Sequence, residues 1–215
     1  MADDCLPQVQ ACAIRVAVLD TNGVPLPGDG NLYVSDALTT LTINPEVKEG
    51  SEIEEENACG NVCVSYQGDP SLKWATIELE LCTADPYLEA LLGSGTVLDL
   101  GPDTPAGFAF PKIGPMRSNG VSIELWAKRI NNGDVDPDYP YAHWAFPKIT
   151  QLRPGSREFG NSAQKPSFTG RALENVNWFD GPANDFDGPS DRVAQWIPAT
   201  SIPAAACGTQ ALVAS

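Results

Sequence analysis

Two glutamates, Glu78 and Glu80, have the spacing at which a pair of carboxylates could do chemistry. They stand two positions apart in residues 72–82, where apolar and polar side chains alternate as in a half-buried strand. Alternate residues of a strand point to one face about 7 Å apart, a separation that suits two carboxylates acting on a glycosidic bond. Trp74 is in line with the pair and could stack on a sugar. No third polar group accompanies them, so we predict solvated glutamates, and a carbohydrate-binding or hydrolytic β-sandwich stays an alternative.

The sequence has few candidates for catalysis by histidine or for metal binding by aspartates. His143 is the single histidine, so a Ser–His or Cys–His mechanism would depend on it, but it alternates within an aromatic strand and is typical of a structural histidine. The three alternate aspartates of residues 134–138 resemble the start of a calcium loop. Tyr139 stands where the loop needs glycine and Ala145 where it needs glutamate. We therefore predict no enzyme activity, no metal and no cofactor.

The cysteines do not have the spacing of a zinc site. Cys59 and Cys63 are four positions apart, whereas zinc knuckles place two residues between paired cysteines, and His143 alone could add a nitrogen ligand. Free thiols are the prediction, with a disulfide and a zinc site as alternatives. The six are Cys5, Cys12, Cys59, Cys63, Cys82 and Cys207.

The segments that would position these groups alternate with period two, as strands do. In residues 72–82, Ile77 and Leu79 fall on one face and the two glutamates on the other. Residues 121–128 repeat this pattern, and further strand candidates are residues 39–43, 61–66, 142–152 and 167–173. Two-faced strands of this kind predict a mainly β fold, an antiparallel β-sandwich or barrel with one wetted side.

One short helix is predicted directly after the strongest strand. Asp85 can cap its N-terminus, Pro86 suits its first turn and Gly93 can end it. Leu88 and Leu91 belong to its apolar stripe. We expect this helix to flank the sheet and to pack on its apolar face.

Net charge excludes one class of function. The chain has 215 residues, with 28 Asp and Glu against 13 Lys and Arg, for a formal net charge of −15. A protein that grips nucleic acid would carry a basic stripe to displace counterions, and this sequence has none. The outward strand positions are polar and partly acidic, namely Thr76, Glu78, Glu80, Ser122 and Glu124.

The chain is predicted to form one domain with a tail. Residues 1–190 are expected to form the β domain, with a long acidic loop at about 48–57 between two strand candidates. Residues 191–215 are rich in Ala and Pro and are expected to form an extended tail. The acidic first residues do not resemble a secretion signal, and no apolar run is long enough to anchor the chain in a membrane. Synthesis and assembly in a bacterial cytoplasm are therefore expected.

Two groups of segments together resemble the major tail protein, or tail tube protein, of phages with long non-contractile tails (Siphoviridae-like), particularly those of actinobacteria. The first group runs from the Cys59–Cys63 turn through the strand at 72–82 to the helix start. The second is rich in aromatic residues. Both occur in the order found in that family and cover somewhat under half the chain: residues 57–66, 72–82, 85–88 with Gly93, and then 141–147, 168–172 and 177–182.

The resemblance implies a structural virion protein. Members of that family form hexameric rings that stack into the tail tube, share a fold with the type VI secretion tube, and conduct DNA from the capsid to the host. The partners implied are other copies of the chain, the tape-measure protein, the tail terminator and distal tail proteins, in a virion tail assembled in the host cytoplasm. DNA would pass without specific binding.

The family's long loop between rings is matched here by residues 48–57, so the resemblance implies a ring-stacking role for Glu49, Glu52, Glu54, Glu55 and Glu56. The alternation then predicts that Thr76, Glu78, Glu80, Ser122 and Glu124 line an acidic lumen. A tail terminator or head–tail joining protein is the alternative of the same kind. A terminator would stop at single rings, whereas a tube protein would form long tubes.

Overall fold

The computed structural model describes residues 6–99, 101, 106–114, 119–189, 191–204 and 210–212. The regular elements are strands, apart from one helix. The elements are β1 (Gln8–Val18), β2 (Gly28–Ser35), β3 (Leu38–Lys48), β4 (Glu52–Glu56), β5 (Val62–Gln67), β6 (Ser71–Leu81), α1 (Pro86–Gly93), β7 (Thr96–Leu98), β8 (Gly107–Ala109), β9 (Val121–Asn131), β10 (Asp134–Val135), β11 (Tyr141–Pro154), β12 (Ser167–Leu173), β13 (Gln195–Ala199) and β14 (Gln210–Leu212).

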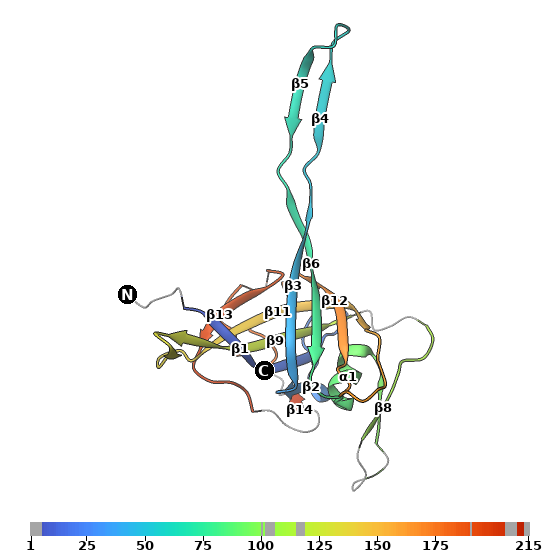
Figure 1. Ribbon diagram of the computed structural model, residues 1–215, viewed down its shortest axis with the longest axis vertical. Helices are drawn as coiled ribbons and strands as arrows, with labels where there is room; N and C mark the ends of the chain where they lie inside the picture. The colour runs from blue at the N-terminus through green and yellow to red at the C-terminus, as the bar shows by residue number, and fades with distance from the viewer. Residues whose placement is uncertain are drawn as a thin grey trace.

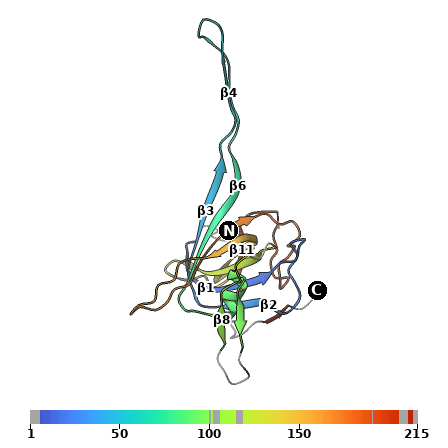
Figure 2. The same ribbon diagram turned by 90° about the vertical axis from the view of Figure 1, so that its right-hand side faces the viewer.

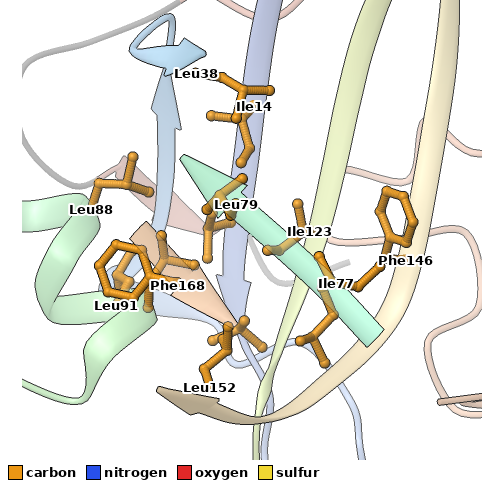
Figure 3. Packing of buried hydrophobic residues seen from close by; sticks show 14 of the residues in the cluster. Ile14, Leu38, Ile77, Leu79, Leu88, Leu91, Ile123, Phe146, Leu152 and Phe168 are labelled. Atoms are coloured by element: carbon orange, nitrogen blue, oxygen red, sulfur yellow. The ribbon is translucent and has the colours of Figure 1, made fainter. Parts of the chain in front are cut away.

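One large antiparallel sheet accounts for the body of the protein (Figure 1). Its main path runs in the order β14-β2-β1-β9-β11-β12-β6-β3. The sheet folds back on itself, so that β6 crosses over β1, β9 and β11 (Figure 3). We call β3, β6, β12 and residues 150–154 of β11 the front layer, and β2, β1, β9 and residues 141–149 of β11 the back layer. The predicted mainly β, antiparallel, sandwich-like fold with one helix is confirmed.

A bulge in β11 lets one strand serve both layers. Its first part pairs with β9 as far as Ile149, and its last part pairs with β12 through Arg153 and Thr169. The register of both ladders shifts in this region, and Gln151 has a left-handed φ of 54°. An extra residue of this kind bends a strand and increases its twist, which is how a strand turns the corner between two packed layers.

The core lies between the two layers and follows the predicted alternation (Figure 3). Ile77 and Leu79 of β6 are at most 2% exposed and pack in one cluster with Ile14 of β1, Ile123 of β9 and Phe146 of β11. The layers are therefore held together by side chains from alternate positions of each strand. Such burial contributes about 1.5–3 kcal/mol for each large side chain.

Helix α1 forms where the sequence predicts it. The Asp85 carboxylate accepts hydrogen bonds from the backbone N–H groups of Tyr87 and Leu88, at 3.1 and 3.2 Å. Pro86 occupies the first turn, and Ser94 ends the helix in the left-handed conformation that Gly93 was expected to supply. Leu88 is fully buried in the core cluster, which fixes the helix against the sheet.

Replacing the cap is expected to loosen this end of the sandwich. Asp85→Ala removes both backbone hydrogen bonds and the hydrogen bond that Tyr33 donates to the carboxylate. We expect a loss of about 1–2 kcal/mol in the free energy of unfolding, measured by urea titration. Asp85→Asn keeps an acceptor at the cap and should retain most of the stability. Equal losses from the two variants would contradict a capping role.

The C-terminal part of the described chain covers the outer side of the back layer. Trp178 and Phe186 are 1% exposed and pack with Leu19 and Ala145 in a second apolar cluster. Beyond them β13 pairs with β11, and β14 pairs with β2. Of the residues after 190 that were expected to form an extended tail, the described strands β13 and β14 belong to the large sheet.

Candidate functional site

The most prominent feature of the surface is a long hairpin formed by residues 44–73, which we call the arm. It rises from β3 and β6 and projects far beyond the body (Figures 1 and 2). The β3–β6 ladder runs to the pair Lys48 and Ser71, and β4 then pairs with β5. At the tip, the side chain of Asn57 accepts backbone hydrogen bonds from Cys59 and Asn61 at 2.9 and 3.0 Å. The arm is thus a β-ribbon with a register shift in each of its two ladders, where a loop at 48–57 was expected.

The arm contributes almost no side chain to the core of its own chain. Every residue of β4 and β5 is exposed, including the apolar residues Ile53, Val64 and Tyr66, of which Tyr66 is 59% exposed. Val47 and Leu72, which are paired across the base of the arm, are also about half exposed. A two-stranded ribbon in water is marginally stable by itself. The arm therefore has the composition of a surface that a partner covers.

Charge is distributed unevenly over the arm. The arm has seven carboxylates, and six of them lie on its outgoing half, residues 44–56. The returning strand β5 has none. Ile53 faces Tyr66 and Glu55 faces Val64, so one side of the ribbon mixes apolar and acidic groups. The predicted stacking residues Glu49, Glu52, Glu54, Glu55 and Glu56 are all exposed in the structure. Their role in ring stacking stays a prediction.

The front layer presents its polar face to solvent. Glu78 is exposed, and Thr76 and Glu80 are half-buried beside it. The Lys165 ammonium lies 3.4 Å from the Glu80 carboxylate. The ring of Trp74 is covered by the guanidinium of Arg171 at 4.5 Å. A sugar would have to displace that cation, so the tryptophan and the two glutamates do not form an open carbohydrate platform.

Ser122 and Glu124 do not face solvent, and their predicted place on a wetted face is wrong. Ser122 is 1% exposed and Glu124 is fully buried. The alternation in β9 is as expected, since Val121 and Ile123 point into the core. The opposite face of β9 is covered by the C-terminal segment, which no local pattern in β9 reveals. Both residues are thereby excluded from a water-filled lumen.

Glu124 lies at the centre of a buried ionic cluster on that covered face. Arg15 of β1 donates two hydrogen bonds to its carboxylate, each of 2.6 Å, and Nε2 of His143 lies 2.9 Å from the same carboxylate. Arg15 also donates to Asp185 of the C-terminal segment at 2.6 and 3.0 Å. His143 stacks on Trp126 with a centroid separation of 4.1 Å. His143 is buried with a polar partner and a stacked ring, the surroundings that a structural histidine is expected to have.

The electrostatics of the cluster favour an ion pair over a metal site. Burial acts to lower the pKa of Arg15, but the carboxylates of Glu124 and Asp185 outweigh this and hold its pKa above the usual range. Ligand atoms of Glu124, His143 and Asp185 lie within 4.8 Å of one another, a spacing that could suit a metal ion. The guanidinium of Arg15 already supplies a positive charge between the two carboxylates. We therefore interpret the cluster as structural.

Arg15 is the key residue of this cluster that the sequence analysis did not identify. It interrupts the run of residues 13–19, in which every residue is buried. A strand buried on both faces has a continuous apolar run, so a single arginine within it indicates a buried partner. The acidic residues of the 134–138 loop are likewise structural in part, because Asp136 is buried 3.6 Å from Arg129.

The cysteines of the described chain are free thiols. Cys59, Cys63 and Cys82 are exposed and Cys12 is half-buried. Cys5 and Cys207 lie outside the described residues. Within the described residues no helix is long and apolar enough to cross a membrane.

Comparison with known proteins finds a distant structural likeness. No model of a known protein family matches the chain, and no curated protein matches it. Among solved structures, it is similar to a chain of the PVC sheath–tube complex, an extracellular contractile injection system in its extended state. The identity is 13%, the match covers 80% of this chain and 89% of that chain, and the TM-score is 0.34. A TM-score of this size does not establish a shared fold.

Proposed function

We propose that this protein is the structural subunit of a phage-type tail tube, in which copies of the chain form hexameric rings that stack on one another. The observation that carries the proposal is the arm. It extends away from the body, exposes apolar and acidic side chains along its length, and buries almost none of them in its own chain. A projection of this kind reaches a neighbouring molecule at a distance.

The geometry of the arm favours repeated association over a closed dimer. The arm leaves the body at one end, so an arm that binds the body of another copy makes a contact between two different surfaces. Contacts of that kind propagate from copy to copy and generate rings or filaments. A stacked tube combines both, with rings closed side by side and arms joining one ring to the next.

Thr76, Glu78 and Glu80 are proposed to face the lumen of this tube. They lie on the solvent face of the layer from which the arm rises. A chain with a net charge of −15 repels DNA, so DNA could pass along the lumen without being held. In this proposal the chain belongs to a virion tail assembled in the host cytoplasm, with tape-measure, terminator and distal tail proteins as partners.

Negative-stain microscopy of the purified protein over a range of concentrations tests the proposal. Tubes of uniform diameter with a visible axial repeat are expected. Single rings that never lengthen would favour a tail terminator or head–tail joining protein instead. A protein that remains monomeric at every concentration would overturn the proposed function.

A further inference from the structure

The loop of residues 155–166, which joins β11 to β12, is attached to the body mainly through one side chain. Among the described residues, Arg157 and Lys165 are the members of 156–165 that make a hydrogen bond or an ion pair. The ion pair of Lys165 lies at the surface, whereas the side chain of Arg157 is 15% exposed. Phe159 is 79% exposed and does not return to the core. Arg157 is thus the buried attachment of this loop.

The guanidinium of Arg157 is paired with a buried carboxylate. It donates a hydrogen bond to Glu89 of α1, whose side chain is 1% exposed. Within the described residues Glu89 has no other ion pair. A buried carboxylate needs a cation or several hydrogen bonds to offset its lost hydration. The body therefore has a place for one positive charge beside α1.

Two aromatic rings complete this place, and with Glu89 we call them the cation cage. The guanidinium carbon of Arg157 lies 5.4 Å from the ring centroid of Phe108 in β8 and 4.9 Å from that of Phe110. Ring faces attract cations, and a flat guanidinium can stack on them while its N–H groups bind a carboxylate. A Cβ at Gly95 would lie 2.2 Å from the Phe108 ring, so the absence of a side chain there lets the ring approach.

The cation cage opens at the surface of the molecule. Phe110 is 55% exposed, and β8 lies at the end of the body opposite to the arm (Figures 1 and 2). The ion pair and both ring contacts are made by the guanidinium group of Arg157. The cage therefore recognises the head group of an arginine, whichever segment carries it.

We propose that the cation cage is a recognition site for an arginine side chain, which Arg157 occupies as a tethered ligand and which an arginine of another protein chain can fill in its place. The incoming arginine keeps Glu89 paired and stacks on the same two rings. Arg157 then leaves the cage, and the 155–166 loop loses its buried attachment. This inference does not depend on the proposed function.

Arg157→Ala tests the site, because it removes the tethered ligand and leaves the cage to a free one. The probe is N-acetyl-arginine amide, which we expect to bind this variant with a Kd of about 1 mM. At about 20 mM, the probe should then raise the ratio of folded to unfolded protein about twentyfold. The Tm of the variant, followed by tryptophan fluorescence, should rise by about 4–7 °C. The wild type should respond by less than about 1 °C, since Arg157 fills its cage.

Matched probes and variants separate recognition from general stabilisation. N-acetyl-lysine amide has the same charge but no flat guanidinium, so its Kd should be at least about tenfold higher. Arg157→Ala combined with Glu89→Gln has no buried charge to pair. It should be more stable than Arg157→Ala alone and should not respond to either probe. Arg153→Ala, at an exposed arginine of β11, should change neither the Tm nor the response.

A rise in Tm that requires both the arginine probe and Glu89 is the expected result. If Arg157→Ala is unfolded in buffer, refolding on addition of the probe replaces the Tm as the readout. Circular dichroism would follow it, with the double variant as the folded reference. No response, an equal response to the lysine probe, or an equal response of the double variant overturns the site. None of these results depends on tube formation, so the proposed function is tested separately.

Discussion

Replacing residues 49–70 with an Asn-Gly turn is expected to give a folded protein that forms no tubes. Lys48 and Ser71 are directly paired, so a two-residue turn can join them without changing the register of β3 and β6. The shortened chain keeps the whole core, because the removed residues contribute nothing to it. If three side chains of the arm pack well against a neighbouring copy, each contributes about 2 kcal/mol to the binding free energy. Removing all three would weaken association by about 10⁴-fold. Sedimentation velocity and negative stain measure the loss.

Two comparisons separate the role of the arm from general damage. The urea midpoint of the shortened chain should match that of the full chain at a concentration where both are monomeric. Tyr66→Ala combined with Ile53→Ala keeps the length and charge of the arm but removes a facing apolar pair, and should weaken tube formation by an intermediate amount. Normal tubes from the shortened chain would refute a role of the arm in stacking.

Arg15→Met is expected to destabilise the monomer more than loss of the Asp85 helix cap does. It leaves Glu124 buried without its cation and removes the contact that holds Asp185 to the sheet. Breaking a buried ion pair by removing one partner costs about 3–5 kcal/mol. For a chain of this size that corresponds to a fall in Tm of about 6–20 °C. Urea and thermal unfolding followed by tryptophan fluorescence would measure it.

The paired control changes both partners of the ion pair between Arg15 and Glu124. Arg15→Met with Glu124→Leu removes the unpaired charge, so much of the lost stability should return. Asp185 is 43% exposed at its side chain and can be solvated without its partner. Arg153→Met, at an exposed arginine of the same sheet, should change the free energy of unfolding by less than about 0.5 kcal/mol. A comparable small effect from Arg15→Met would show that the cluster is not a structural ion pair.

Local patterns predicted part of this fold with good accuracy. The alternation in residues 72–82 assigned Ile77 and Leu79 to the core, and the cap, proline and leucine spacing located α1. These features depend on neighbours two to four residues apart, so they can be read along the chain. Residues 48–57 were expected to form a loop because this strongly acidic stretch joins two strand candidates. The pairing of β4 with β5 makes residues 52–56 a strand, and pairing is a property of two segments.

The sequence by itself therefore determined three local features. They are the apolar side of each strand, the start of the helix, and the acidic character of the outgoing half of the arm. Only the tertiary structure decided which polar faces meet water. Glu78 and Glu124 have the same local pattern, yet one is exposed and the other is buried beneath the segment that carries Asp185 and Phe186. The difference comes from Arg15, which is 109 residues from Glu124, and from Asp185. A carboxylate can be buried only where a distant cation compensates its lost hydration, and folding alone brings the two together.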